Sequence, residues 1–159
     1  MMNPTMKHLM PLTIAILLVL VPTGCSRDLL SEPWDASEID KIQVVLAMGN
    51  PEYGADSKII TNRVEIEGLV NAFNGATIGD RVRDSDLAVA DASRYYLYSE
   101  GSLVRQFVFN ANDSERIWYN SKWHYISYPD EKPYDLYRAS EADVIVVDED
   151  LNEMERPGS

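Results

Sequence analysis

The sequence predicts an α+β domain in which an antiparallel meander sheet of about five strands packs on one main amphipathic helix. Residues 62–75 repeat their apolar side chains with the period of an α-helix. Residues 94–127 instead alternate apolar and polar side chains and are interrupted by two short turns. A chain of 159 residues has room for one ordinary domain, which we expect over residues 39–139.

The first expected strand lies at residues 39–48, ahead of the helix. It is rich in β-branched and apolar residues and stops at a Gly-Asn-Pro sequence that is typical of a turn. Residues 58–61 are a second, short extended piece that leads into the helix.

The helix is the best-defined element of the sequence. Asn62 is suited to cap its first turn, and Glu65 three residues later is suited to complete a capping box. Its apolar side chains fall on one face, which we expect in the core: Ile66, Leu69, Val70 and Phe73. Gly75 is typical of the left-handed residue that ends a helix.

Residues 75–92 show no sustained period, so we expect a long loop there. Its acidic residues are Asp80, Asp84, Asp86 and Asp91. Carboxylates two residues apart are compatible with the start of a calcium-binding loop, but the further ligands and the glycine of an EF-hand do not follow. The sequence therefore predicts a solvated loop and no metal ion.

Two hairpins are expected after this loop, and together they make a meander of four antiparallel strands. The first pairs residues 94–99 with residues 102–110, and the second pairs residues 115–119 with residues 122–127. The first hairpin turns at Glu100-Gly101 or at Gly101-Ser102, two positions that leave the same side chains on each face, and the second turns at Asn120-Ser121.

Regular pairing in the first hairpin divides its side chains between two faces. One face is uncharged, and we expect it under the helix. Its side chains are Tyr95, Leu97, Val104, Gln106 and Val108. The other face mixes aromatic side chains with arginines. Its side chains are Arg94, Tyr96, Tyr98, Leu103, Arg105, Phe107 and Phe109.

The second face supplies the candidate binding surface: Arg94, Tyr96, Tyr98, Arg105 and Phe107. Flat aromatic rings beside arginine suit a protein partner or a sugar. The alternative is that the two phenylalanines are buried beneath the carboxy-terminal segment and that the arginines only cover the edge. Aromatic side chains are commonly buried, which favours this alternative.

The second hairpin places Trp118 opposite Trp123 and His124 beside Ile117. Cross-strand tryptophan pairs more often stabilise a sheet than bind a ligand. An ordinary, partly exposed histidine is likewise the simpler interpretation of His124.

The carboxy-terminal part predicts little regular structure. Residues 128–138 contain Pro129 and Pro133 and are expected to cross the sheet as a proline-shaped loop. Residues 140–159 are strongly acidic and are expected to form a solvated tail, in which residues 144–147 could add one edge strand.

The amino-terminal segment predicts export and lipid anchoring. Residues 12–21 are almost all aliphatic, follow Lys7, and are too few to span a bilayer, which needs about 20 apolar residues. Two small residues then precede Cys25, the only cysteine. This layout resembles the signal peptide of bacterial lipoproteins, which implies cleavage after residues 1–24, acylation of Cys25 and a charged tether over residues 25–38.

The alternative for Cys25 is a free thiol behind an ordinary signal peptide. An exported chain with one cysteine has no disulfide partner for it within the chain, so lipidation accounts better for its position and its isolation. The expected location is the extracytoplasmic face of the cell membrane, with the lipid as the only membrane contact.

Charge and composition exclude several function classes. The formal net charge of −12 repels phosphate backbones, which argues against nucleic-acid binding. After Cys25 the chain has one histidine, His124, so a zinc site with several histidine or cysteine ligands cannot form. A glycine-rich phosphate loop and the G-x-S-x-G and H-E-x-x-H motifs are missing from the sequence, and we expect no cofactor.

The order of elements supports a further comparison. A strand at Lys41-Ile42, the segment 58–62 before the helix, a hairpin over residues 96–109 and the sequence Trp-His-Tyr-Ile before Pro133-Tyr134 follow one another. This order, over residues 39–138, resembles small lipoprotein domains of uncharacterised function found in Gram-positive spore-forming bacteria. The resemblance implies location and fold, and it implies no site residues.

Two functional hypotheses follow. The first is a non-catalytic binding or accessory module that meets a protein or a cell-wall polymer at the membrane. The second is a small hydrolase or calcium-dependent enzyme that uses His124 and the aspartates of the loop from Asp80 to Asp91.

Overall fold

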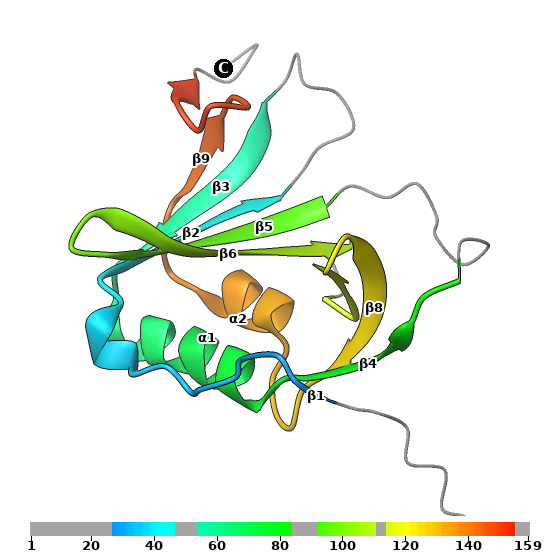
Figure 1. Cartoon of the computed structure of the whole chain (residues 1–159). Coiled ribbons are helices and arrows are strands. Elements are labelled where there is room, and N and C mark those ends of the chain that lie inside the picture. The colour runs from blue at the N-terminus through cyan, green and yellow to red at the C-terminus, as the bar shows by residue number, and fades with distance from the viewer. Residues whose placement is uncertain (1–26, 47–53, 84–91, 111–113, 155–159) are drawn as a thin grey trace, which may run out of the picture.

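The computed structural model describes residues 27–46, 54–83, 92–110 and 114–154. These residues form one antiparallel sheet of ten strands with two α-helices on one side (Figure 1). The strand order is β1-β4-β8-β7-β6-β5-β2-β3-β9-β10. The predicted fold class, with about five strands on one main helix, is wrong, because the described residues are mostly sheet.

The strands are β1 (Arg27–Asp28), β2 (Lys41–Leu46), β3 (Ala55–Ile60), β4 (Thr77–Arg81), β5 (Ala92–Ser99), β6 (Ser102–Asn110), β7 (Arg116–Tyr119), β8 (Lys122–Ser127), β9 (Val144–Val147) and β10 (Glu153–Met154). The helices are α1 (Arg63–Gly75) and α2 (Pro133–Ala139), preceded by a short 3-10 helix, η1 (Ala36–Glu38).

Three strands come from segments in which the sequence carries no clear strand pattern: β1 lies in the expected tether, β4 in the expected loop, and β10 in the expected acidic tail. β9 has the bounds of the strand that residues 144–147 could add. β1 and β10 have two residues each, which is too few to show alternation. β9 is not at the edge, because it pairs with β3 on one side and β10 on the other, and Val146 and Val147 are buried.

Helix α2 replaces the proline-shaped loop expected over residues 128–138. Pro133 starts the helix, a position at which the missing N–H of proline has no helical partner in any case. Tyr137 is buried, and its ring stacks on Tyr134 with 6.2 Å between ring centroids. A seven-residue helix with two prolines nearby has too few turns to show a clear apolar period.

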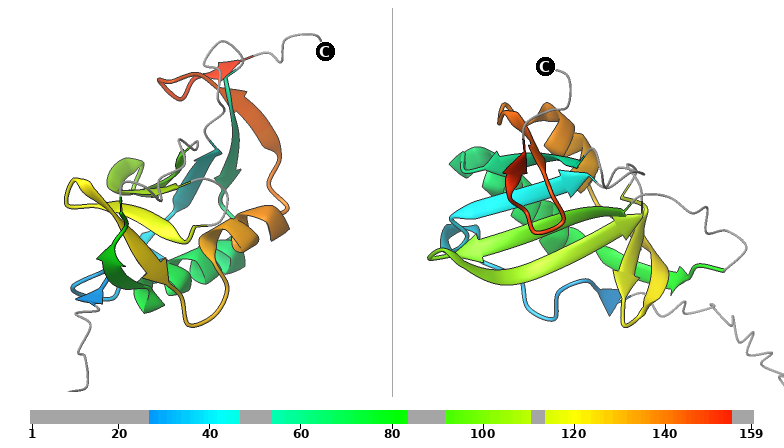
Figure 2. Two further views of the ribbon diagram at one scale, coloured as in Figure 1. Left: turned by 90° about the vertical axis from the view of Figure 1, so that its right-hand side faces the viewer. Right: turned by 90° about the horizontal axis from the view of Figure 1, so that it is seen from above.

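Helix α1 lies in the core as predicted, and the sheet bends round it so that β8, β4 and β1 lie near the helix end that leads into β4 (Figures 1 and 2). All four side chains of the predicted apolar face are buried: Ile66, Leu69, Val70 and Phe73. The Phe73 ring contacts Tyr95, Phe107 and Phe109, with centroid distances of 5.7, 4.6 and 6.2 Å.

The amino-terminal cap of α1 is confirmed, but the capping box is not. Asn62 Oδ1 accepts hydrogen bonds from the backbone N–H groups of Val64 and Glu65, at 2.9 and 3.3 Å. The Glu65 carboxylate instead accepts from Ser140 Oγ at 2.5 Å and from the Glu141 N–H at 3.1 Å. It therefore ties α1 to the segment that follows α2.

The expected left-handed stop at Gly75 is also wrong. Gly75 is the last residue of α1, and the next residue, Ala76, is extended at φ −73°. Gly75 is required for a different reason: a Cβ atom at this position would lie 2.7 Å from Cγ of the Pro129 ring. The glycine allows the segment after β8 to approach the helix.

We predict opposite effects for alanine at the two glycines of α1. Gly75→Ala should lower the free energy of unfolding by about 1–3 kcal/mol, because the added methyl group overlaps Pro129. Gly68→Ala should raise it by about 0.5–1 kcal/mol, because its Cβ would make an ordinary 3.7 Å contact with Leu136 and alanine favours the helix. Urea unfolding of both variants measures this, and equal effects would contradict the packing of Pro129 on Gly75.

A β-bulge in the first hairpin changes the faces that regular pairing predicts. Tyr98 lies opposite Leu103, as a turn at Glu100-Gly101 predicts, but the next pair is Leu97 with Arg105, so that Val104 is an extra residue on β6. Beyond this point every side chain of β6 lies on the face opposite to the one predicted, because a shift of one residue exchanges the faces of a strand.

The bulge places Phe107 and Phe109 on the same face as Tyr95 and Leu97, and all four side chains are buried. The phenylalanines pack on Phe73 of α1 rather than beneath the carboxy-terminal segment. The residues predicted under the helix that do not lie there are Val104, Gln106 and Val108. Regular pairing would have exposed two phenylalanine rings to water. The bulge buries them, and their burial stabilises the fold.

The second hairpin has the predicted register. Trp118 lies opposite Trp123, and Ile117 lies opposite His124. The turn residues Asn120 and Ser121 have φ angles of 48° and 62°, as a two-residue hairpin turn of this type requires.

The segment expected as a free tether packs on the domain. Leu29 and Leu30 are buried, and the Leu29 N–H donates to the Ala76 carbonyl at 2.9 Å. The backbone of Trp34 makes two hydrogen bonds with the Asn74 side chain, at 2.8 and 2.9 Å. The packed domain therefore begins before the predicted boundary at residue 39. Cys25 and the expected signal peptide lie outside the described residues.

Candidate functional site

The five residues of the predicted binding surface do not lie on one face. Arg94, Tyr96 and Tyr98 lie on the face of the sheet opposite to α1, whereas Phe107 is in the core. Arg105 is directed to the helix side, where its guanidinium lies 5.4 Å from the centroid of the Trp34 ring. The bulge thus separates the predicted surface into two parts.

Tyr98 is engaged within the chain. The Lys41 ammonium group lies 3.9 Å from the centroid of the Tyr98 ring, an arrangement that stabilises a cation over an aromatic face. Partial burial, with a smaller contribution from Tyr96, raises the pKa of the Tyr98 hydroxyl. The hydroxyl is therefore uncharged at neutral pH.

The second hairpin supplies aromatic side chains to the same face as Arg94 and Tyr96. Since Ile117 pairs with Phe109 and faces the core, alternation directs the neighbours of Ile117 on β7 and the neighbours of His124 on β8 outward. We call the resulting surface the outer aromatic face. Its residues are Arg94, Tyr96, Arg116, Trp118, Trp123 and Tyr125.

Two rings of the outer aromatic face are unusually accessible for their size. Trp118 is 46% exposed and Tyr125 is 42% exposed, whereas Trp123 is half-buried. The two tryptophan rings meet edge to face, with a centroid distance of 5.4 Å and an interplanar angle of 67°. This geometry is favourable for an aromatic pair, and it fixes both rings on the sheet.

Sequence reasoning found the tryptophan pair but not the surface to which it belongs. The two-residue turn fixes the register of the second hairpin, so it also places Arg116 opposite Tyr125 on the tryptophan side. The sequence did not show that Arg94 and Tyr96 lie on the same face as the tryptophans. That placement depends on the bulge at Val104, which decides the faces of β6 between the two hairpins.

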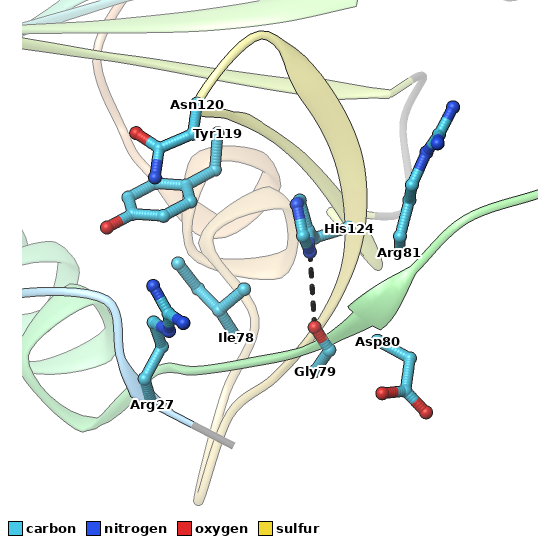
Figure 3. A pocket seen from close by; sticks show the side chains of 8 residues that line it. All are labelled: Arg27, Ile78, Gly79, Asp80, Arg81, Tyr119, Asn120 and His124. Atoms are coloured by element: carbon cyan, nitrogen blue, oxygen red, sulfur yellow. Dashed lines mark hydrogen bonds between the residues drawn. The ribbon is translucent and has the colours of Figure 1, made fainter. Parts of the chain in front are cut away.

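A pocket of about 220 Å³ lies at another place, between β1, β4 and the turn that joins β7 and β8 (Figure 3). Arg27, Tyr119 and Asn120 lie on one side of it, and His124 lies on the other side (Figure 3). The remaining lining residues are Ile78, Gly79, Asp80 and Arg81. The register between β4 and β8 shifts between Ile78 and Arg81, so the pocket lies at an irregularity of the sheet.

The backbone fixes the imidazole of His124. Nδ1 lies 3.2 Å from the carbonyl oxygen of Gly79, and this oxygen can only accept, so Nδ1 carries the hydrogen. The Tyr119 ring meets the imidazole edge to face at 6.1 Å. The partner of Nδ1 is a carbonyl rather than the carboxylate of a catalytic triad, and the lining includes no serine, threonine or cysteine.

The aspartates considered for calcium are only partly described. Asp80 is exposed on β4, and its carboxylate points away from His124 (Figure 3). Asp84, Asp86 and Asp91 lie outside the described residues. Within residues 27–46, 54–83, 92–110 and 114–154, no group of three or more histidine, cysteine, aspartate or glutamate side chains is placed to hold a metal ion.

Comparison of the chain with protein-family models, with curated proteins and with solved structures finds no match. In the part of the chain that the structure describes, no helix is both long enough and apolar enough to cross a membrane.

Proposed function

We propose that this chain is a lipid-anchored, extracytoplasmic binding module that contacts a partner protein through the outer aromatic face. The observation that carries this proposal is the exposed pair Trp118 and Tyr125, which half-buried aromatic and arginine side chains surround on the same face of the sheet. The module acts by binding and performs no catalysis of its own.

The composition of the outer aromatic face favours a protein over a polymer as the partner. Tryptophan, tyrosine and arginine are the residues most enriched among those that dominate the affinity of protein interfaces. The cross-strand pairs Trp118–Trp123 and Arg116–Tyr125 present such side chains from regular, antiparallel strands. Because the rings are held by the sheet, little conformational freedom would be lost on binding.

The position of Cys25 just before β1 supports a domain held close to the membrane. Cys25 precedes β1 by two residues, and the segment that follows packs on the domain through Leu29 and Leu30. An acylated Cys25 would thus hold the end of the domain that carries β1 and β4 near the lipid headgroups.

Lipid anchoring is tested by Cys25→Ala in cells that produce the full chain. We expect the parent protein in the membrane fraction, with a mature amino terminus at Cys25 whose mass includes acyl chains, and we expect the variant to lose the lipid. A variant that keeps the acylated mass and the membrane location would contradict this part of the proposal.

The binding surface is tested by comparing Trp118→Ser with Val64→Ser. Both positions are exposed, but Val64 lies on α1, on the other side of the sheet, and is 76% exposed. Capture of the partner protein from a membrane extract should fall about tenfold or more with Trp118→Ser, as expected for a dominant interface residue, and should not change with Val64→Ser. Sedimentation with isolated cell wall that depends on Trp118, without a captured protein, would instead assign a polymer.

A further inference from the structure

We infer that the pocket lined by Arg27, Tyr119, Asn120 and His124 binds a phosphate ester. This site is separate from the outer aromatic face, because His124 and Tyr119 alternate with Trp123 and Trp118 along their strands and are directed to the opposite side of the sheet. The phosphate has two available sources, the headgroup of an anionic phospholipid and a small soluble ester.

The size of the pocket limits the ligand. A volume of about 220 Å³ is smaller than the 300–1,000 Å³ typical of sites for drug-sized molecules, so it admits a small group such as a phosphate with a few attached atoms. A polymer or a folded partner could reach it only with such a terminal group.

The donors in the pocket favour an anion. Arg27 offers a permanently charged guanidinium whose planar set of N–H groups matches phosphate oxygens. The Asn120 amide and the Tyr119 hydroxyl are further donors, and both side chains are directed to the same side as Arg27 (Figure 3). Arg81 also lines the pocket, but its guanidinium is directed away from Arg27, so Arg27 is the positive charge that faces the ligand (Figure 3).

The remaining groups do not oppose an anion at this position. The Asp80 carboxylate is directed away from the Arg27 side of the pocket (Figure 3). His124 has its Nδ1–H occupied by Gly79, so Nε2 is the nitrogen that remains for a ligand. Ile78 supplies an apolar wall for the carbon atoms of an ester.

The lipid source rests on the proposed anchor. Arg27 is two residues from Cys25 in the sequence, so an acylated Cys25 would bring this pocket to the depth of the phospholipid headgroups. Positively charged side chains at that depth are attracted to anionic lipids. A soluble phosphate ester requires the same donors but not the anchor.

The test uses residues 26–159 without the lipid, since every described strand and helix lies within this part of the chain. Calorimetric titration with glycerol 3-phosphate probes the soluble source. Sedimentation with phosphatidylcholine vesicles, with and without phosphatidylglycerol, probes the lipid source. Arg27→Gln removes a pocket charge, and Arg138→Gln is the matched control, because it removes the same charge from exposed Arg138 on α2.

We expect saturable binding to at least one probe, weakened about tenfold or more by Arg27→Gln and within about twofold of the parent for Arg138→Gln. Binding to phosphatidylglycerol vesicles alone assigns the lipid, and binding to glycerol 3-phosphate alone assigns a soluble ester. Saturable binding to neither probe, or equal losses in the two variants, would overturn the inference. Partner capture that still depends on Trp118 would leave the proposed function intact in that case.

Discussion

Phe107→Ala should destabilise the domain by about 3–5 kcal/mol, the cost of replacing a fully packed phenylalanine by alanine. Phe107 is 6% exposed, and its ring lies 4.6 Å from Phe73 and 6.3 Å from both Trp34 and Phe109. Removing it leaves a cavity between α1 and the sheet, lined by rings that cannot all move to fill it. The midpoint and slope of urea unfolding, followed by circular dichroism, measure the change.

The matched control is Val104→Ala. Regular pairing of the first hairpin predicts Val104 under the helix and Phe107 outside, whereas the bulge leaves Val104 47% exposed. The variant should therefore change the free energy of unfolding by no more than about 0.5 kcal/mol. A larger loss from Val104→Ala than from Phe107→Ala would show that the hairpin pairs regularly and that the bulge is absent.

Lys58→Met should lower the free energy of unfolding by about 2–4 kcal/mol, because charged hydrogen bonds are lost and buried acceptors are left without partners. Lys58 is buried, and its Nζ donates to the carbonyl oxygens of Tyr137 at 3.1 Å and of Ser140 at 2.6 Å. These carbonyls belong to the end of α2, where helical partners are missing and a positive charge is favourable. Methionine keeps the apolar stem but supplies no donor.

Lys41→Met is the control for this prediction. Lys41 is partly exposed and its ammonium group lies over the Tyr98 ring, so its loss should cost about 0.5–1 kcal/mol. Thermal and urea unfolding of both variants give the comparison. Similar small losses for the two lysines would mean that Lys58 does not hold the end of α2 on the sheet.

The parts of the fold that the sequence predicted are those with strong local signals. The apolar period of α1 is repeated over two turns, and Asn62 provides a distinct cap. In the second hairpin, a two-residue turn determines the register, so the pair Trp118–Trp123 followed directly. Such features are decided by residues close together in the sequence.

The parts that could not be predicted depend on distant residues. The bulge at Val104 is required because two phenylalanines must meet Phe73 of α1, and regular alternation cannot show this requirement. β1 and β10 exist because β4 and β9 offer open edges to them. Helix α2 is held through Lys58, which lies 79 residues before Tyr137 in the chain.

The candidate sites show the same distinction. The outer aromatic face needed the bulge before Arg94 and Tyr96 could be placed beside the second hairpin. The pocket joins Arg27 with His124, which are far apart in sequence, and it forms only because β1 pairs with β4 and β4 pairs with β8. A search of the sequence for motifs could not bring these residues together.

The most direct test of the proposed function is crosslinking in the native membrane from two positions of the full chain. A photoreactive amino acid replaces Gln106 in one protein and Val64 in the other, and mass spectrometry identifies what is bound after irradiation. Gln106 is exposed and lies opposite Tyr96, so it borders the outer aromatic face without removing one of its residues. We expect one discrete protein adduct from position 106 and none from position 64. Identical adducts from both positions, or no protein adduct from position 106, would contradict a binding module that uses the outer aromatic face.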